Sequence, residues 1–228
     1  MTLTMTFPTV EANVEVVRPR SFAAIRLIGI GGKKEAGKDA VADHLVDKHG
    51  WVKLGMSDPL DEALRRQNPY IQIKPGELLN TTKSVKYLQY QDIRKKLDYV
   101  QAKTIVNVRY NLQTLGTEVG RELLGKDTWV TVADNMIFDL LADGKNVVLT
   151  GVRFPNELRL INKYEAGETW YVTRPSAKKE AKGDEIITAQ HASETSVSAD
   201  DFTFVIDNDG SLEDLYKKVD DGLVRVRD

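Results

Sequence analysis

A glycine-rich stretch at residues 29–40 constrains the fold of this chain more than any other feature. It overlaps the end of an apolar run, residues 25–30, and precedes a helical pattern of apolar side chains that starts at Val41. Gly32, Gly37 and Lys38 fit G-x-x-x-x-G-K, a loop in which backbone N–H groups and a helix N-terminus face a phosphate. The stretch therefore predicts an α/β nucleotide-binding fold in which Lys38 reaches the terminal phosphates. The alternative is a plain glycine turn between a strand and a helix.

Asp39 departs from the usual loop, which has Ser or Thr after the lysine as a magnesium ligand. A carboxylate oxygen also binds Mg²⁺, directly or through water. Many phosphate-loop proteins have a second acidic residue at the end of another strand. At the corresponding strand end this chain has Thr150-Gly151-Val152, without an acid. We therefore expect Mg²⁺ as the cofactor and Asp39 as its protein ligand.

Length and composition exclude several classes of protein. The 228 residues suffice for one α/β domain with a small lid, and a net charge of −2 gives no sign of a nucleic-acid or membrane binder. Without cysteine there are no disulfides, thiolate metal sites or cysteine nucleophiles, and the composition fits a cytoplasmic location. The three histidines are scattered, so His44 and His49 are expected on a solvated helix face rather than in a zinc site.

After an irregular extension, residues 1–20, strands and helices are expected to alternate. The alternation predicts a parallel sheet covered by helices on both faces, with ligands at the carboxyl ends of the strands. Residues 68–82 are expected to form a loop, and 174–190 a polar, mobile segment. The expected strands are residues 25–30, 51–54, 146–150, 169–173 and 202–206, and the expected helices are 39–49, 57–68, 84–103, 109–124 (broken near Gly116), 129–141, 155–164 and 211–224.

The strand-end loops should share one rim that carries basic side chains. Phosphoryl transfer needs two phosphates in line and cations that neutralise the moving group. Lys38 and Mg²⁺ would hold the donor, and Arg153 is favoured for the acceptor because it lies three residues past a buried strand. The alternative for each of these lysines and arginines is that it is a solvated surface residue without a role in binding. The other candidates for the acceptor phosphate are Lys34, Arg109 and Arg121.

Residues 113–121 combine two glycines, hydroxyl groups, a carboxylate and an arginine beside apolar residues. One interpretation is a kinked helix with a charged face. The other is an acceptor pocket, in which Thr117 or Glu118 hydrogen-bonds a base or sugar and Arg121 holds a phosphate. Trp129 would stack on a base or belong to the core.

Three segments resemble the bacteriophage deoxynucleoside monophosphate kinases: residues 32–39 with the aspartate variant, 112–129, and 152–157. The resemblance implies a P-loop kinase domain over residues 21–228, with a helical substrate-binding region at about 58–142 and a lid at about 174–192. It implies that Lys38, Lys34 and Arg153 are catalytic. It places ATP against Gly32, Glu35, Ala36, Gly37, Lys38, Asp39 and Ala40, and the acceptor nucleotide against Lys34, Arg109, Thr117, Glu118 and Trp129. The strand-end rim and the stretch 113–121 add Ser57, Gly116 and Arg121 to the candidates for the acceptor nucleotide.

The expected activity is transfer of the γ-phosphoryl group of ATP to a deoxynucleoside monophosphate, for phage DNA precursor synthesis in the host cell cytoplasm. One alternative is another small-molecule P-loop kinase, such as one that acts on dephospho-coenzyme A. Another is a nucleotide-binding regulator without an acceptor. ATP and the monophosphate are the expected partners, with no nucleic acid polymer and no membrane. The sequence leaves open whether the chain forms a homodimer, which bases are accepted and whether ribonucleotides are excluded.

Overall fold

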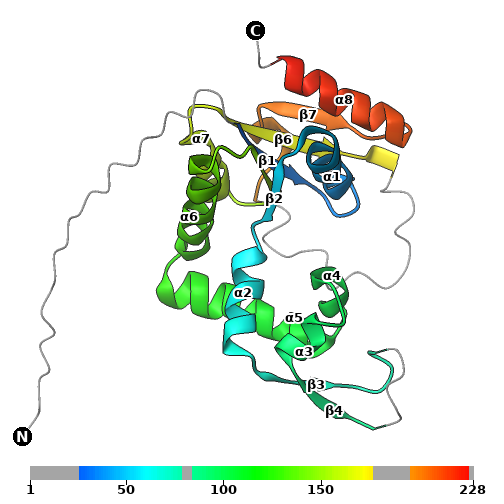
Figure 1. The fold of residues 1–228 in the computed structure, drawn as a ribbon, viewed down its shortest axis with the longest axis vertical. Helices are drawn as coiled ribbons and strands as arrows, with labels where there is room; N and C mark the ends of the chain where they lie inside the picture. The colour runs from blue at the N-terminus through cyan, green and yellow to red at the C-terminus, as the bar shows by residue number, and fades with distance from the viewer. Residues whose placement is uncertain (1–25, 79–83, 177–195, 226–228) are drawn as a thin grey trace, which may run out of the picture.

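The computed structural model describes residues 26–78, 84–176 and 196–225 (Figure 1). Within them, five parallel strands form one sheet in the order β2-β5-β1-β6-β7. The predicted parallel sheet is confirmed. The extension, residues 1–20, and most of the expected lid, residues 177–192, lie outside the described residues. The strands are β1 Leu27–Gly32, β2 Val52–Gly55, β5 Val147–Val152, β6 Gly167–Thr173 and β7 Phe204–Asp207.

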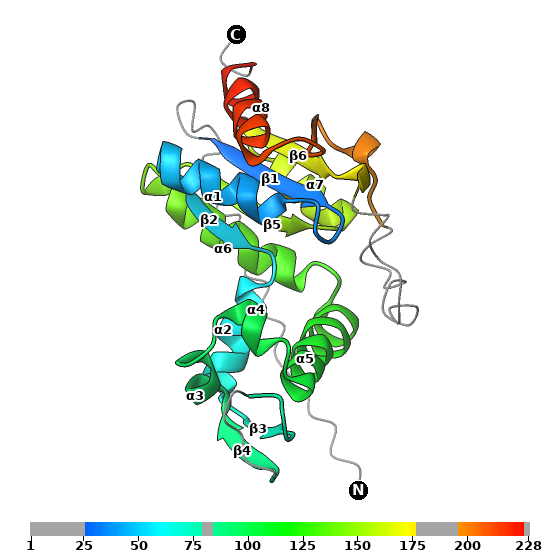
Figure 2. The ribbon, with the colours of Figure 1, turned by 90° about the vertical axis from the view of Figure 1, so that its right-hand side faces the viewer.

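Helices cover both faces of the sheet (Figure 2). On one face α6 (Thr128–Ala142) and α7 (Pro155–Asn162) pack over Leu27 and Leu149. On the other face α1 (Lys38–His49) and α8 (Leu212–Arg225) pack over Ile28 and Ile30. Successive residues of β1 therefore enter opposite cores, as expected for a strand buried on both sides. None of the described helices is long and apolar enough to cross a membrane.

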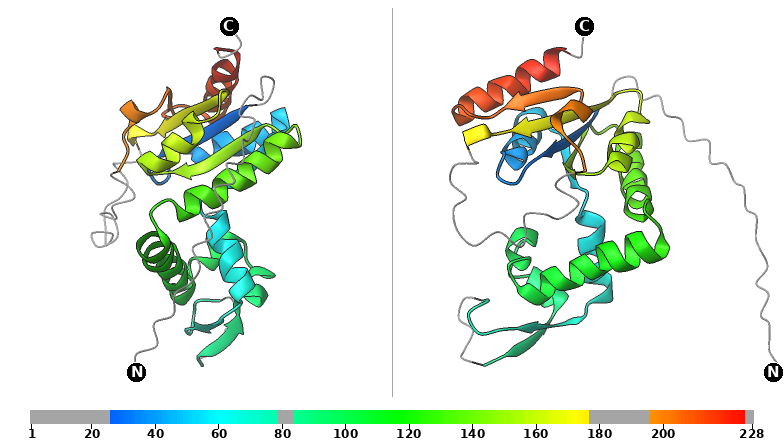
Figure 3. Two further views of the ribbon diagram at one scale, coloured as in Figure 1. Left: turned by 90° about the vertical axis from the view of Figure 1, so that its left-hand side faces the viewer. Right: turned by 180° about the vertical axis from the view of Figure 1, so that it is seen from behind.

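The chain between β2 and β5 forms a second region with its own core, which lies below the sheet in both views of Figure 3. Its core contains Leu64, Ile71, Ile93, Ile105 and Val108. Because α2 continues from β2 and α6 leads back to β5, this region joins the sheet by two connections. Its elements are α2 Asp58–Gln67, β3 Tyr70–Ile73, β4 Lys86–Gln89, α3 Tyr90–Arg94, α4 Tyr99–Ala102, α5 Val106–Gln113 and a π-helix, Thr114–Leu124.

Two predictions for this region are wrong. The expected loop at residues 68–82 contains β3, which pairs with β4 in an antiparallel hairpin because Ile71 and Ile73 alternate into the core. The expected helix at residues 84–103 is β4 followed by two short helices. Asp98 ends any continuous helix there, since its side chain accepts from the backbone N–H of Gln101 in a capping box that starts α4.

The predicted break near Gly116 is also absent. Instead α5 continues directly into the π-helix Thr114–Leu124, which ends at Gly125. The two glycines in the helical pattern therefore coincide with a change from α-helix to π-helix rather than with a break in the helix. The remaining predicted elements agree with the structure to within about three residues at each end, the usual uncertainty of such boundaries.

Candidate active site

The loop between β1 and α1 has the backbone shape that its glycines predict. Gly32 and Gly37 have φ angles of 136° and 99°. A Cβ atom on Gly32 would lie 2.3 Å from the carbonyl oxygen of Val172, and one on Gly37 would lie 2.3 Å from Nδ2 of Asn208. Asn208, just past β7, donates from Nδ2 to the Ala36 carbonyl at 2.9 Å and anchors the loop. The loop therefore requires both glycines and delivers the chain to the N-terminus of α1, an anion-binding position.

Lys38 and Asp39 open α1 at this loop. The Lys38 Nζ donates to the Lys33 carbonyl at 2.5 Å, so its ammonium group lies across the loop. Asp39 is 80% exposed, and its Oδ1 lies 3.1 Å from Nζ of Lys53 on β2. Burial lowers the pKa of Lys53, but hydrogen bonds to Asp43 and Asp39 together raise it above its usual value. Lys53 therefore stays charged and holds the Asp39 carboxylate beside the phosphate loop.

A pocket at the carboxyl ends of β1, β5 and β6 brings two predicted cations together. Lys34 comes from the phosphate loop, and Arg153 directly follows β5. This meeting agrees with the expectation that strand-end loops share one rim. The residues that line this rim pocket are Gly32, Lys33, Lys34, Val152, Arg153, Tyr171 and Val197.

Lys103 approaches the same rim from the region below the sheet. It follows α4, and its Nζ lies 4.2 Å from the centroid of the Tyr99 ring. Burial lowers the pKa of Lys103, and the charges of Arg153 and Arg109 lower it further, against the opposing effect of Asp39 and Asp58. Lys103 therefore lies within electrostatic reach of both Arg109 and Arg153, and Arg153 comes from a separate part of the chain. Arg109 also donates from Nε to the Lys103 carbonyl at 3.3 Å.

The sequence prediction missed Lys103 because it placed this residue at the end of a long exposed helix. The capping pair Asp98 and Gln101 was the available signal, since it starts the separate short helix α4, whose C-cap residue is Lys103.

The turn from β2 to α2 forms another part of the rim. Ser57 precedes α2 and hydrogen-bonds the side chain of Tyr99. The carboxylate of Asp58 accepts from the Gly55 N–H at 2.7 Å, and burial raises the pKa of Asp58 despite that hydrogen bond. The predicted Ser57 thus lies where the sheet meets the helical region. Asp58 is an acidic residue that follows the end of β2. The sequence analysis looked for such an acid at the end of β5, where the residue is Gly151.

The π-helix presents Thr117 and Glu118 to solvent. The indole of Trp129 donates from Nε1 to the Gly116 carbonyl at 2.9 Å and lies against Gly120, where a Cβ atom would be only 2.1 Å from that nitrogen. Trp129 therefore packs within the protein and closes the π-helix onto the start of α6, as the packing interpretation of this residue expects.

Arg121 positions the backbone around Arg153. Its Nη2 donates to Oε1 of the buried Glu157 at 3.1 Å, and its guanidinium lies 3.8 Å from the Phe154 ring centroid. Glu157 Oε2 in turn accepts from the backbone N–H groups of Arg153 at 2.7 Å and Phe154 at 3.1 Å. Burial raises the pKa of Glu157, while these two N–H groups and the Arg121 charge oppose the rise. Arg121 and Arg153 thus share one hydrogen-bond network.

Three comparisons relate this chain to known proteins. A family model described as deoxynucleotide monophosphate kinase matches residues 60–219. The curated proteins contain no match. A solved dephospho-CoA kinase from Campylobacter jejuni has a TM-score of 0.50 at 11% identity, over 88% of this chain and 96% of that one, which shows a shared fold. TT1252 from Thermus thermophilus has a TM-score of 0.48 at 18% sequence identity, over 88% of this chain and 97% of that one. A shikimate kinase from Bacteroides thetaiotaomicron has a TM-score of 0.44 at 12% sequence identity, over 87% of this chain and 98% of that one.

Proposed function

The chain belongs to the deoxynucleotide monophosphate kinase family, and from this premise we propose that it transfers the γ-phosphoryl group of ATP to a deoxynucleoside monophosphate. The products are ADP and the deoxynucleoside diphosphate. One observation carries the proposal beyond the family: cations from the phosphate loop and from the end of β5 line one rim pocket, and Lys103 of the helical region lies within electrostatic reach of Arg153. A kinase needs two sets of phosphate contacts, whereas a nucleotide sensor needs only one.

The donor side of the site is the β1–α1 loop. The loop residues Gly32, Glu35, Ala36, Gly37 and Ala40 present backbone around the ATP phosphates, in the manner of a G-x-x-x-x-G-K loop. The ammonium group of Lys38, now on the Lys33 carbonyl, turns to the β- and γ-phosphates when ATP binds. The N-terminus of α1 adds its positive dipole end.

The acceptor side is built by the helical region and the end of β5. Lys103, Arg109 and Arg153 receive the acceptor phosphate, with Lys34 between the two nucleotides. Because three cations gathered at one place repel each other, a bound dianion removes an unfavourable interaction that the free protein carries. The exposed side chains of Thr117 and Glu118, with Gly116 and Ser57, lie along the nucleoside end, and Arg121 acts through Glu157 on Arg153.

The oxygen donors beside the phosphate loop fit Mg²⁺. Asp39 is exposed in the first turn of α1, and carboxylate oxygen is the ligand type that Mg²⁺ prefers. When bound, Mg²⁺ neutralises charge on the ATP phosphates. The acceptor phosphate oxygen then forms a bond to the γ-phosphorus while the bond from that phosphorus to the bridging oxygen of ADP breaks. Lys38 and Arg153 stabilise the negative charge on the transferred group.

A panel of acceptors tests the proposal. ADP formation is measured by a coupled assay with ATP, Mg²⁺ and each of the four deoxynucleoside monophosphates, their ribose counterparts, or dephospho-coenzyme A. We expect turnover with at least one deoxynucleoside monophosphate and none without an acceptor. Turnover with dephospho-coenzyme A alone would replace the proposed substrate class. ATP binding without turnover on any acceptor would favour a regulator.

Asp39→Asn should raise the Mg²⁺ concentration needed for half-maximal rate by at least about 10-fold, because the amide lacks the charge that attracts the ion. The measurement is the initial rate over a Mg²⁺ titration at fixed ATP. Asp43→Asn is the matched control, since Asp43 binds the same Lys53 from one turn further along α1. An Mg²⁺ dependence equal to that of the control would remove Asp39 from the metal site.

Lys103→Met should raise the KM for the acceptor by about 10-fold or more, because a hydrogen bond to a charged group contributes about 1.5–3 kcal/mol. The KM for ATP should stay close to that of the unchanged protein, since Lys103 belongs to the acceptor side. Lys96→Met, an exposed lysine of the same region, serves as the control. Equal changes in both KM values would show that Lys103 supports the fold rather than the acceptor.

A further inference from the structure

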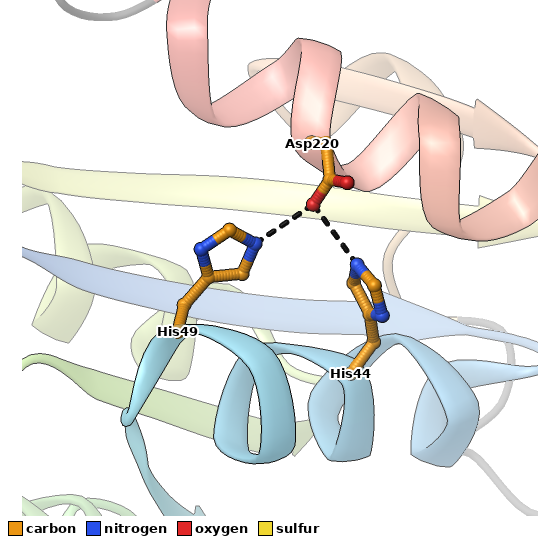
Figure 4. Close-up of side chains that lie close together, drawn as sticks. All are labelled: His44, His49 and Asp220. Carbon is orange, nitrogen blue, oxygen red and sulfur yellow. Dashed lines mark hydrogen bonds and ion pairs between the residues drawn. The ribbon is translucent and has the colours of Figure 1, made fainter.

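Two histidines of α1 and one aspartate of α8 converge on a single point (Figure 4). His44 and His49 each place Nε2 beside Oδ1 of Asp220, at 2.9 Å and 2.7 Å. One ligand atom from each residue lies within 4.8 Å of the others. The sequence expectation of a solvated face is wrong for His44, which is 8% exposed, because α8 covers that side of α1.

Two imidazole nitrogens and one carboxylate oxygen are a ligand set typical of Zn²⁺, with water in the fourth position. We propose that His44, His49 and Asp220 bind a divalent transition metal ion, with Zn²⁺ as the favoured ion. Ligands of a tetrahedral Zn²⁺ ion are about 3.3 Å apart, given bonds of about 2.0–2.1 Å. The observed nitrogen-to-oxygen distances are about 0.5 Å shorter than this, so the carboxylate and the imidazoles must move apart by about that amount when the ion binds.

The surrounding side chains orient this ligand set. The Tyr216 ring stacks on His44 at 4.2 Å with an interplanar angle of 11°, which fixes the imidazole with Nε2 toward Asp220. Lys48 Nζ binds the other carboxylate oxygen, Oδ2, at 2.6 Å and leaves Oδ1 to the histidines. Burial would raise the pKa of Asp220, but hydrogen bonds from Lys48, His49 and His44 hold it well below its usual range, so the carboxylate is ionised.

The position separates this site from the phosphate loop. His44 and His49 follow Lys38, the first residue of α1, by 6 and 11 positions, so about 9 and 16 Å of helix separate them from it at 1.5 Å per residue. The ligand chemistry separates them too, because Mg²⁺ prefers oxygen ligands whereas imidazole suits Zn²⁺. A bound ion would join α8 to α1 and thereby stabilise the packing of the last described helix. His49 and Asp220 are each 29% exposed, which gives the ion a path from solvent.

Titration of protein without an affinity tag tests this proposal, with Co²⁺ absorption as the readout of ligand geometry and calorimetry for Zn²⁺. We expect one ion per chain, a Co²⁺ spectrum of low coordination number, and a higher melting temperature with Zn²⁺. His49→Ala should weaken binding by about 100-fold or more, since even outer partners of metal ligands contribute 10–100-fold. His49→Ala changes an exposed helix end and should fold, as circular dichroism would verify.

Two further variants distinguish a built site from adventitious binding. Lys48→Met should bind Zn²⁺ more tightly than the unchanged protein, because it removes a cation from the same carboxylate. His191→Gln is the matched control: His191 is the third histidine of the chain, lies outside the described residues, and should leave binding unchanged. No Zn²⁺ heat and no Co²⁺ spectrum, or equal binding by His49→Ala, would overturn the proposal and leave a hydrogen-bonded ion pair.

Discussion

Lys38→Ala is expected to lower kcat for ADP formation by about 1,000-fold, in line with the effect of one cation on phosphoryl transfer. The Lys38 ammonium group lies across the phosphate loop, against the Lys33 carbonyl, and no residue of α1 supplies a second cation at that end of the described helix. The measurement is steady-state kinetics in the coupled assay, with circular dichroism to verify the fold.

Lys145→Ala is the control for this prediction. Lys145 is an exposed lysine that precedes β5, so it lies at the opposite edge of the sheet from the rim. Its removal should leave kcat unchanged. If Lys38→Ala retained full activity, the β1–α1 loop would not be the ATP site.

Arg153→Ala is expected to lower kcat by about 100- to 1,000-fold, with a smaller change in the KM for ATP, because removing one preorganised donor from a transition state has an effect of this size. Glu157 holds the backbone N–H of Arg153, so the point from which this exposed side chain enters the rim pocket is set before substrates bind. Kinetics at saturating ATP and varied acceptor measure the effect. Arg153→Lys should recover part of the rate, since it restores the charge without the planar guanidinium.

Arg159→Ala provides the matched comparison. Arg159 is an exposed arginine on α7, a few residues after Arg153. A normal rate for Arg153→Ala, or an equal loss in Arg159→Ala, would make Arg153 a surface charge and would leave the acceptor phosphate to Lys103 and Arg109.

The sheet and the phosphate loop were predictable because their signals are local. Gly32, Gly37 and Lys38 occur at a fixed spacing, and an apolar run before them with a helical pattern after them fixes the order of elements. The rim could be inferred as well, since every parallel strand ends at the same edge. That rule placed Arg153 at the rim from its position after β5, and Arg153 lines the rim pocket.

The helical region was less predictable because its elements are short. Residues 84–103 carry apolar side chains at a helical spacing, yet Lys86–Gln89 pairs with Tyr70–Ile73, and this pairing outweighs the local preference. The position of Lys103 depends on that pairing and on the capping box at Asp98, so the cluster with Arg109 and Arg153 was visible only in the structure.

The histidine cluster was missed for a different reason. Asp220 is 171 positions after His49, and the packing of α8 on α1 brings them together. Nothing in the spacing of His44 and His49 alone indicates a third ligand, because that ligand comes from a helix whose place in the fold is set by the sheet order.

Phosphorus NMR of the reaction mixture tests most directly the claim that the rim aligns two nucleotides for direct transfer. With ATP, Mg²⁺, the enzyme and a deoxynucleoside monophosphate, the signal of the β-phosphate of a deoxynucleoside diphosphate should appear in step with ADP. The γ-phosphate of ATP should decline by the same amount. Inorganic phosphate in its place, or ADP formation that does not depend on the monophosphate, would contradict the proposed alignment.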